Sequence, residues 1–267
     1  MEDIMSEEQK NPIQSADRIF MVMETLAGTG PIGLVDLSTR IGLHKSTVHR
    51  LLLSLICMGY VAQDENNKYR LTYKLMEISS RALAGMDEVT IAHPYLEKLA
   101  NECRETVHLV ECRGCEVVYI DKVTPIIRND SAIRMASQIG LSRPMYSSGV
   151  GKAILAQLPE EEVKFIWENS IIEKKTEYTI ISLEDLMEEL KKIRERGYAL
   201  DNEENEIGVR CIAACIFDYR GKVKNAFSIS APAIKMTDAR IDELAEKVLG
   251  VREQLSREFG YRESTNG

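Results

Sequence analysis

The sequence predicts an α+β protein in which a small helical domain with a short hairpin precedes a larger domain built around a central antiparallel sheet. Three observations support this prediction. The chain has 267 residues, a length that suits two domains. Apolar residues recur at helical spacing between residues 15 and 58, whereas strand-like runs are frequent after residue 106. Hairpins interspersed with helices are typical of an antiparallel α+β domain.

Three segments with helical periodicity, each followed by glycine, open the chain and predict three short helices. Two strand-like segments separated by a polar turn follow and predict a β-hairpin. Three helices followed by such a hairpin form a winged helix-turn-helix. The expected helices span residues 15–28, 33–41 and 45–58, and the expected strands span 60–62 and 68–71.

The outer face of the third predicted helix is polar and basic, at the position where a helix-turn-helix meets the major groove of DNA. A solvated helix face without a partner is the alternative, but the order of helix, helix, glycine turn, basic helix and hairpin argues against it. The sequence therefore predicts binding to a double-stranded DNA operator. We expect Ser46, Thr47, His49 and Arg50 to face bases or phosphates, and Lys45, Lys68 and Arg70 to bind phosphate.

The net charge of −8 is unevenly distributed. Residues 10–75 carry eight Lys or Arg and five Asp or Glu, so the acidic excess lies elsewhere. DNA is therefore attracted to the N-terminal part and repelled by the rest of the chain. The sequence contains no run of 18 apolar residues, and its acidic start lacks the pattern of a signal peptide. We expect a cytoplasmic protein.

A further helix is expected at residues 72–85, and Asp87 can cap the next one at about 88–104. We interpret this pair as a linker whose apolar residues pack against a partner such as a second subunit. The expected division is a DNA-binding domain at 11–73, a linker helix at 74–87 and a second domain at 88–264.

In the second domain, strands alternate with helices from residue 106 to the end of the chain. Turns at residues 113–114 and 219–221 predict two hairpins. The expected strands are 107–111, 116–121, 133–136, 209–217 and 222–230, and the expected helices follow residue 149 and span 159–168, 182–197 and 237–259.

The segment at residues 144–153 most resembles a binding site, because hydroxyls and glycines precede an apolar helix. The free N–H groups and positive partial charge of a helix start suit a carboxylate or a phosphate. The segment is not a Walker P-loop, since Tyr146 and Ala153 occupy positions where that motif has glycine and Ser or Thr. A serine-capped helix without a ligand is the alternative.

Ser228 and Ser230 lie two residues apart on a predicted strand and therefore point to the same face. Their hydroxyls require partners if buried, and either a ligand or neighbouring backbone groups can supply them. The acidic run at 201–206 is typical of a solvated loop, although its end leads directly into a predicted strand.

The sequence contains no set of residues that predicts catalysis, a cofactor or a metal site. Cys112 and Cys115 flank a predicted turn, but two further ligands at zinc-like spacing are missing. No nucleophile and base occur in a known arrangement, and there is no G-x-S-x-G sequence near Ser147. We expect a protein that is not an enzyme.

Taken in order, three segments resemble the IclR family of bacterial transcription regulators. They are HKSTVHRLL at 44–52, MYSSGVGKAILA at 145–156 and GYALDNEENEIGVRCIAA at 197–214. The resemblance implies a winged-helix domain, a linker helix and a GAF-like effector-binding domain, assembled as a homodimer or as a homotetramer of two dimers. The passages ETVHLVE, DKV, IRMASQIG and TEYTIISLEDL are similar to the family's sugar-acid catabolism repressors that respond to 2-keto-3-deoxygluconate.

Two residues depart from the family pattern. Cys215 stands where proline is usual, and His49 stands where tyrosine is common, so an operator sequence cannot be carried over. The resemblance implies a regulator, with a repressor favoured over an activator, that responds to a small organic acid. The rivals are a constitutive DNA-binding protein whose second domain only oligomerises, and an enzyme with a fused DNA-binding domain. The implied effector pocket comprises Gly149, Val150, Gly151, Asp201, Cys211, Ser228 and Ser230.

Overall fold

The computed structural model describes residues 12–83, 87–126 and 137–262. The chain forms two compact units, residues 1–86 and 87–267, and each is described by itself. Both contain helices and antiparallel strands, so the predicted α+β class is confirmed. In the part of the chain that is described, no helix is long and apolar enough to cross a membrane.

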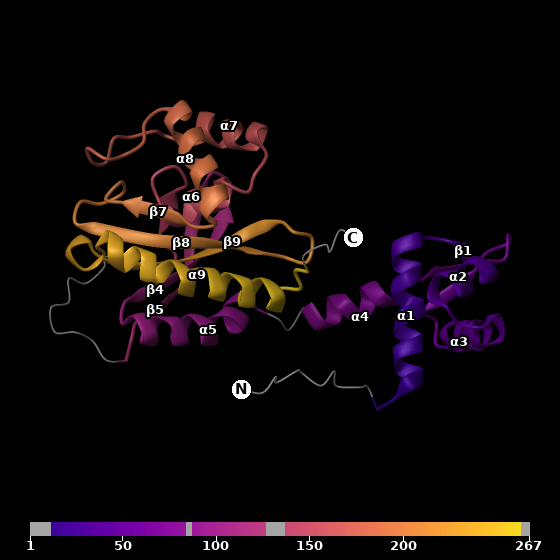
Figure 1. The fold of residues 1–267 in the computed structure, drawn as a ribbon. Helices are drawn as coiled ribbons and strands as arrows, with labels where there is room; N and C mark the ends of the chain where they lie inside the picture. Colours follow the sequence, from indigo (N-terminus) through magenta and orange to yellow (C-terminus); the bar gives the residue numbers. More distant parts are fainter. Residues whose placement is uncertain (1–11, 84–86, 127–136, 263–267) are drawn as a thin grey trace. The chain divides into compact units, whose positions relative to one another are not determined.

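The N-terminal unit is the predicted winged helix-turn-helix (Figure 1). Its small sheet has the order β1-β3-β2, in which the two-residue strand β1 was not predicted because it is too short to show alternation. The apolar faces of the helices meet in one core that includes Val22, Leu37, Val48, Leu52 and Tyr69. The elements are α1 (Gln14–Thr29), β1 (Ile32–Gly33), α2 (Leu34–Ile41), α3 (Lys45–Cys57), β2 (Val61–Gln63), β3 (Lys68–Leu71) and α4 (Lys74–Leu83).

Two turns fix the elements of this unit that are predicted to bind DNA. Gly42 ends α2 with a φ of 67°, a left-handed conformation that favours glycine and lets the chain turn into α3. In the hairpin, the carboxylate of Asp64 accepts hydrogen bonds from the amides of Asn66 and Lys68, both at 2.9 Å. The predicted turn is therefore a defined structure that orients β3.

The second unit contains a six-stranded antiparallel sheet with the order β6-β5-β4-β9-β8-β7 (Figure 1). Strands β6 and β7 were not predicted, because three and four residues give little periodicity. The strand predicted at 133–136 lies outside the described residues. The strands are β4 (Thr106–Arg113), β5 (Glu116–Val123), β6 (Ser142–Pro144), β7 (Ala199–Asn202), β8 (Val209–Phe217) and β9 (Val223–Pro232).

Helices cover both faces of this sheet, and each face has its own apolar core (Figure 1). Alternate residues of β9 point to opposite faces: Phe227 and Ile229 join one core, and Ala226 joins the other. Helices α5 (Glu88–Cys103) and α9 (Asp238–Glu258) cover the first face, and α6 (Gly149–Leu155), α7 (Glu160–Glu168) and α8 (Leu183–Arg196) cover the second. A short 3-10 helix, η1 (Ala233–Lys235), precedes α9.

Candidate DNA-binding surface and effector pocket

The polar residues predicted to read DNA share one side of α3. Lys45, Ser46, His49 and Arg50 are exposed and Thr47 is half-buried. The opposite side of the helix enters the core of the unit. Among the ion pairs of the described residues, none uses Lys45 or Arg50. Their charges are therefore available to phosphate groups.

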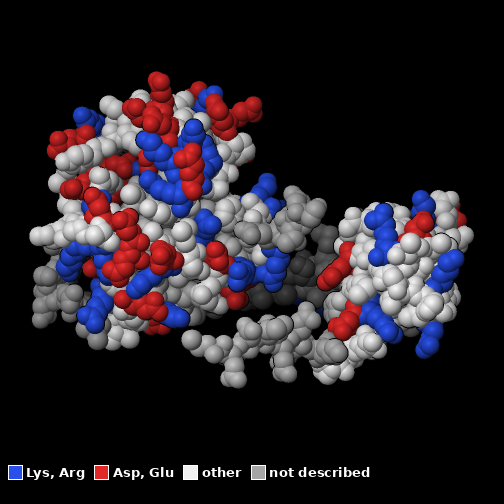
Figure 2. Space-filling view, in the orientation of Figure 1, with Lys and Arg blue, Asp and Glu red and all other residues white. Residues whose placement is uncertain are grey.

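The hairpin presents two more cations in the same unit. Lys68 and Arg70 are exposed on β3, whereas Tyr69 between them is buried. This alternation follows from the two-residue period of a strand, which anchors β3 in the core and turns both cations outward. Lys and Arg side chains stand out from the surface of the N-terminal unit in the space-filling view (Figure 2).

Six of the seven predicted effector-binding residues line one pocket of the second unit. Strand register explains part of this convergence: Asp201 lies opposite Cys211, and Cys211 lies opposite Ser230, on three neighbouring strands. Gly149 and Val150 approach the same place from the start of α6. The pocket is small, with a cavity volume of about 30 Å³.

Gly151 does not line this pocket, and its amide donates to Ser148 Oγ at 3.2 Å as part of the helix cap. A Cβ atom built on Gly151 would lie 2.3 Å from the Cα atom of Met145. Glycine is therefore required here by the close approach of the backbone. Gly149 is also tightly placed, because a Cβ atom there would lie 3.3 Å from the backbone nitrogen of Asp201.

The hydroxyls of Ser228 and Ser230 are 3.4 Å apart and both are buried. Ser230 Oγ lies 3.3 Å from Nδ1 of His108, whose Nε2 lies 2.7 Å from Ser137 Oγ. Burial, with the charges of Lys122 and Arg143, lowers the pKa of His108 to about 3, so the ring is neutral at pH 7. The two predicted serines thus belong to a chain of side-chain hydroxyls and one histidine, three members of which line the pocket.

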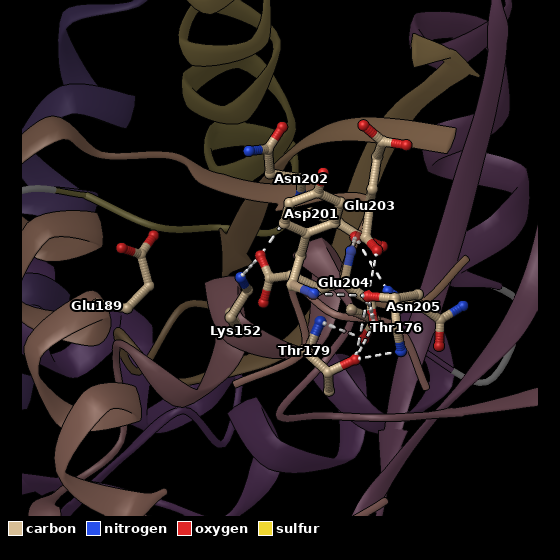
Figure 3. Close-up of polar contacts among 12 residues, drawn as sticks. Lys152, Thr176, Thr179, Glu189, Asp201, Asn202, Glu203, Glu204 and Asn205 are labelled. Carbon is tan, nitrogen blue, oxygen red and sulfur yellow. Dashed lines mark hydrogen bonds and ion pairs between the residues drawn. The ribbon is translucent and has the colours of Figure 1, made fainter. Parts of the chain in front are cut away.

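A buried ion pair joins α6 to the loop after β7 (Figure 3). Lys152 is 1% exposed and contacts Glu204, which is 6% exposed. Thr176 Oγ1 donates to the carbonyl of Glu203 and Thr179 Oγ1 donates to that of Glu204, both at 2.7 Å. The loop that carries two pocket-lining residues, Asn205 and Glu206, is therefore held from two sides.

The expectation of a solvated loop at 201–206 is wrong for Asp201 and Glu204, which are both buried. The positive charge of Lys152 and hydrogen bonds from backbone amides stabilise these two buried carboxyl groups. One oxygen of Asp201 accepts from the amides of Glu204 and Asn205 at 2.9 and 3.3 Å. Burial and the neighbouring charge of Glu204 nevertheless raise the pKa of Asp201 to about 7.

Sequence reasoning missed Arg143, which lines the pocket and supplies a positive charge. Among the described residues, five buried side-chain polar atoms have no hydrogen-bond partner, and two of these, Arg143 Nε and Asn205 Oδ1, belong to pocket residues. Buried polar atoms without partners are rare and call for an explanation, and a polar ligand is one. The sequence offered one indication of its role, because Arg143 directly precedes the segment 144–153 that was predicted to form a binding site.

The half-buried thiols of Cys112 and Cys115 are not joined in a disulfide. Across the described residues, no group of three or more His, Cys, Asp or Glu is arranged to hold a metal ion.

Comparison with known proteins identifies both units. The IclR helix-turn-helix domain matches residues 15–65, and the model described as bacterial transcriptional regulator IclR C-terminal matches residues 80–257. The chain belongs to the IclR family of bacterial transcriptional regulators. The resemblance inferred from the three sequence segments is thereby confirmed, and membership in the IclR family makes the protein a DNA-binding transcriptional regulator.

Relatives within the IclR family are similar over nearly their whole length. The chain is 36% identical to the HTH-type transcriptional regulator KdgR of Escherichia coli, covering 96% of this chain and 97% of that protein. It is 34% identical to the transcriptional repressor IclR of the same organism, covering 93% and 90%. The crystal structure of Thermotoga maritima IclR superposes with a TM-score of 0.62 at 34% identity, covering 92% of this chain and 99% of that one.

Proposed function

We propose that the protein is a repressor of a carbon-catabolism operon that binds a palindromic operator and is controlled by a small organic acid. In this proposal residues 11–73 form the DNA-binding domain, residues 74–87 form a linker helix and residues 88–264 form the effector-binding domain. The protein acts in the cytoplasm. The observation that carries the effector assignment is the pocket itself, in which buried polar atoms of Arg143 and Asn205 lack partners.

DNA binding in the proposal depends on two copies of the chain. Each copy offers one reader helix, α3, and a twofold dimer places two such helices in successive major grooves, about 34 Å apart. Exposed apolar side chains support self-association: Phe20 on α1 and Met76 on α4 are 59% and 63% exposed, and Tyr73 before α4 is 81% exposed. A homodimer, or a homotetramer formed by two dimers, covers them.

The proposed effector is an organic acid, with 2-keto-3-deoxygluconate or a related sugar acid as the first candidate. Amide N–H groups at the start of a helix have no intrahelical partners, so those of Gly149 and Val150 suit a carboxylate. The hydroxyls of Ser228 and Ser230 suit keto or hydroxyl oxygens. The similarity to the regulator KdgR supports this choice of acids.

The test measures DNA affinity with and without acids. An operator is selected from random duplex DNA with the full-length protein, and binding is followed by fluorescence anisotropy during titration with 2-keto-3-deoxygluconate and with pyruvate. An effector must bind the DNA-holding and DNA-releasing states unequally, and we expect a change in operator affinity of about 5- to 150-fold. Replacing Ser228 and Ser230 with alanine should weaken acid binding measured by calorimetry.

Other outcomes identify the rival functions. Operator affinity that no acid changes favours a constitutive DNA-binding protein, whose second unit only oligomerises. Transcription from a reporter that rises with operator occupancy favours an activator. Consumption of an acid by the purified protein favours an enzyme.

A further inference from the structure

A second and wider pocket adjoins the effector pocket. Its cavity volume is about 610 Å³, and the two pockets share Arg143, Asn205 and Glu206 in their linings. The inner pocket, at about 30 Å³, has room for a group of the size of one or two water molecules. The outer pocket lies in the range of 300–1,000 Å³ that is usual for small-molecule sites. The three shared residues therefore mark a neck between a narrow and a wide compartment.

Arg143 is a cation held in place at this neck without an ionic partner. It lies on β6 opposite Val117, its guanidinium is 5.8 Å from the centre of the Tyr119 ring, and Nη1 donates to the carbonyl of Ser142 at 3.1 Å. Its Nε atom is buried without a partner. Among the ion pairs of the described residues, none uses Arg143. The neck therefore offers a pre-positioned guanidinium whose Nε donor is unused.

We propose that Arg143 binds the carboxylate of the effector at this neck and that the outer pocket is a subsite for the remainder of an extended, hydroxylated acid. This inference rests on the proposed function, because it names the residue and the compartment that recognise the acid. One carboxylate oxygen contacts Arg143, and the other is free to meet the amides of Gly149 and Val150 on the inner side.

Charge favours Arg143 as the main partner of the carboxylate. The guanidinium adds the attraction of opposite charges to its hydrogen bond with a carboxylate, whereas the amides of Gly149 and Val150 carry no net charge. The neighbouring histidine cannot substitute for it, because His108 is neutral. Asp201 and Glu206 also line the inner pocket and disfavour a second anionic group there. The positive group at the neck thus selects an acid whose carboxylate lies at this point.

The outer pocket has the chemistry to bind hydroxyl groups. Asn169, Ser170 and Lys175 line it and provide hydrogen-bond donors and acceptors around a space of about 610 Å³. A three-carbon acid bound at the neck leaves most of that space empty, whereas a six-carbon acid extends into it. The structure therefore predicts that acids with longer hydroxylated chains bind more tightly than pyruvate.

The test is isothermal titration calorimetry of the full-length protein with 2-keto-3-deoxygluconate and with pyruvate. Arg143→Gln should weaken binding of the longer acid about 10- to 100-fold, since a charged hydrogen bond is lost. Arg143→Lys should recover part of this loss, because lysine keeps the positive charge but lacks the planar set of guanidinium N–H donors. The matched control is Arg220→Gln: Arg220 also lies over a tyrosine ring, Tyr219 at 4.9 Å, but lines neither pocket. It should bind as the wild type does.

A second variant tests the outer compartment. Ile171 is 82% exposed and lines the outer pocket, so Ile171→Trp narrows it without disturbing the core. Binding of 2-keto-3-deoxygluconate should weaken several-fold, whereas binding of pyruvate should not change. Equal affinity of the wild type for both acids, or an unaffected Ile171→Trp variant, overturns the subsite.

The outcomes separate this inference from the proposed function. Wild-type protein that binds neither acid contradicts the choice of effector in the proposed function. Wild-type protein that binds the longer acid, together with an Arg143→Gln variant of equal affinity, contradicts only the role of Arg143. Circular dichroism melting shows whether Arg143→Gln is folded, and if it is not, Arg143→Lys and Ile171→Trp decide the question.

Discussion

Replacing Lys152 with methionine is expected to destabilise the second unit strongly, because the change leaves carboxyl groups buried without a cation. Lys152 and Glu204 are both almost fully buried, and Oε2 of Glu204 has no partner among the described residues. The neighbouring Asp201 adds a second carboxyl to the same region. Breaking a buried ion pair by removing one member costs about 3–5 kcal/mol. Methionine preserves the unbranched shape of the lysine stem, so little of this loss comes from packing.

The loss should depend on pH. Burial raises the pKa of Glu204, whereas the charge of Lys152 and its hydrogen bond lower it. Without Lys152, the folded-state pKa rises further above its value in the unfolded chain. A carboxyl with a raised folded pKa contributes stability below its unfolded pKa, and this contribution is lost as the pH rises through the folded pKa. The Lys152→Met variant should therefore lose more unfolding free energy at pH 8 than at pH 5.

Urea unfolding followed by tryptophan fluorescence measures this loss of stability in the second unit. The chain has one tryptophan, Trp167 on α7, which packs against the core that contains α6. The control is Lys164→Met, because Lys164 forms an exposed ion pair with Glu160, and exposed pairs contribute little to stability. Adding Glu204→Gln to Lys152→Met should recover at least half of the loss. A loss no larger than that of Lys164→Met, or no recovery in the double variant, would refute the reasoning.

Three further predictions follow from the same structure. Arg50→Ala should weaken operator binding by about 1–3 kcal/mol in a gel-shift titration, and unchanged affinity would reject its role in DNA binding. Gly151→Ala should lower stability by about 1–3 kcal/mol because its Cβ atom meets the Met145 backbone, whereas Gly250→Ala, which meets nothing within 4 Å, should not. Asp201 has a folded-state pKa raised to about 7, so its contribution to stability declines between about pH 4 and pH 7. Asp201→Asn should flatten the pH dependence of the unfolding free energy, measured with urea, over this range. An unchanged slope would contradict the raised pKa.

The N-terminal unit was largely predictable because its signals are local. Helical periodicity, the glycine at residue 42 and the polar turn before Lys68 each act over a few residues, and all three agree with the structure. Strand β1 escaped notice because its two residues form a strand only through pairing with β3, where Ile32 lies opposite Tyr69, 37 positions along the chain. Such pairing leaves no periodic pattern in the sequence.

The proposed effector pocket was predictable only in part. The two-residue period of a strand placed Ser228 and Ser230 on one face, but their neighbours come from other strands. Lys152 and Glu204 are 52 residues apart, and each resembles an ordinary solvated charge until the fold brings them together. Arg143 lies on a three-residue strand whose place in the sheet depends on pairing with β5. Long-range burial, rather than local pattern, defines these three residues.

The proposed DNA-binding surface and the proposed effector pocket share one physical property, which is that they contain polar groups without partners among the described residues. On α3 and β3 the groups are exposed cations. Water solvates these cations, so leaving them without a protein partner costs little free energy, and they can bind phosphate. In the pocket they are buried atoms of Arg143 and Asn205, and each unpaired group costs about 1–3 kcal/mol. A ligand that pairs them recovers this cost and so stabilises the conformation that holds it. If that conformation differs from the one that binds DNA, pairing of these atoms with the acid supplies the free energy that couples acid binding to release of the operator.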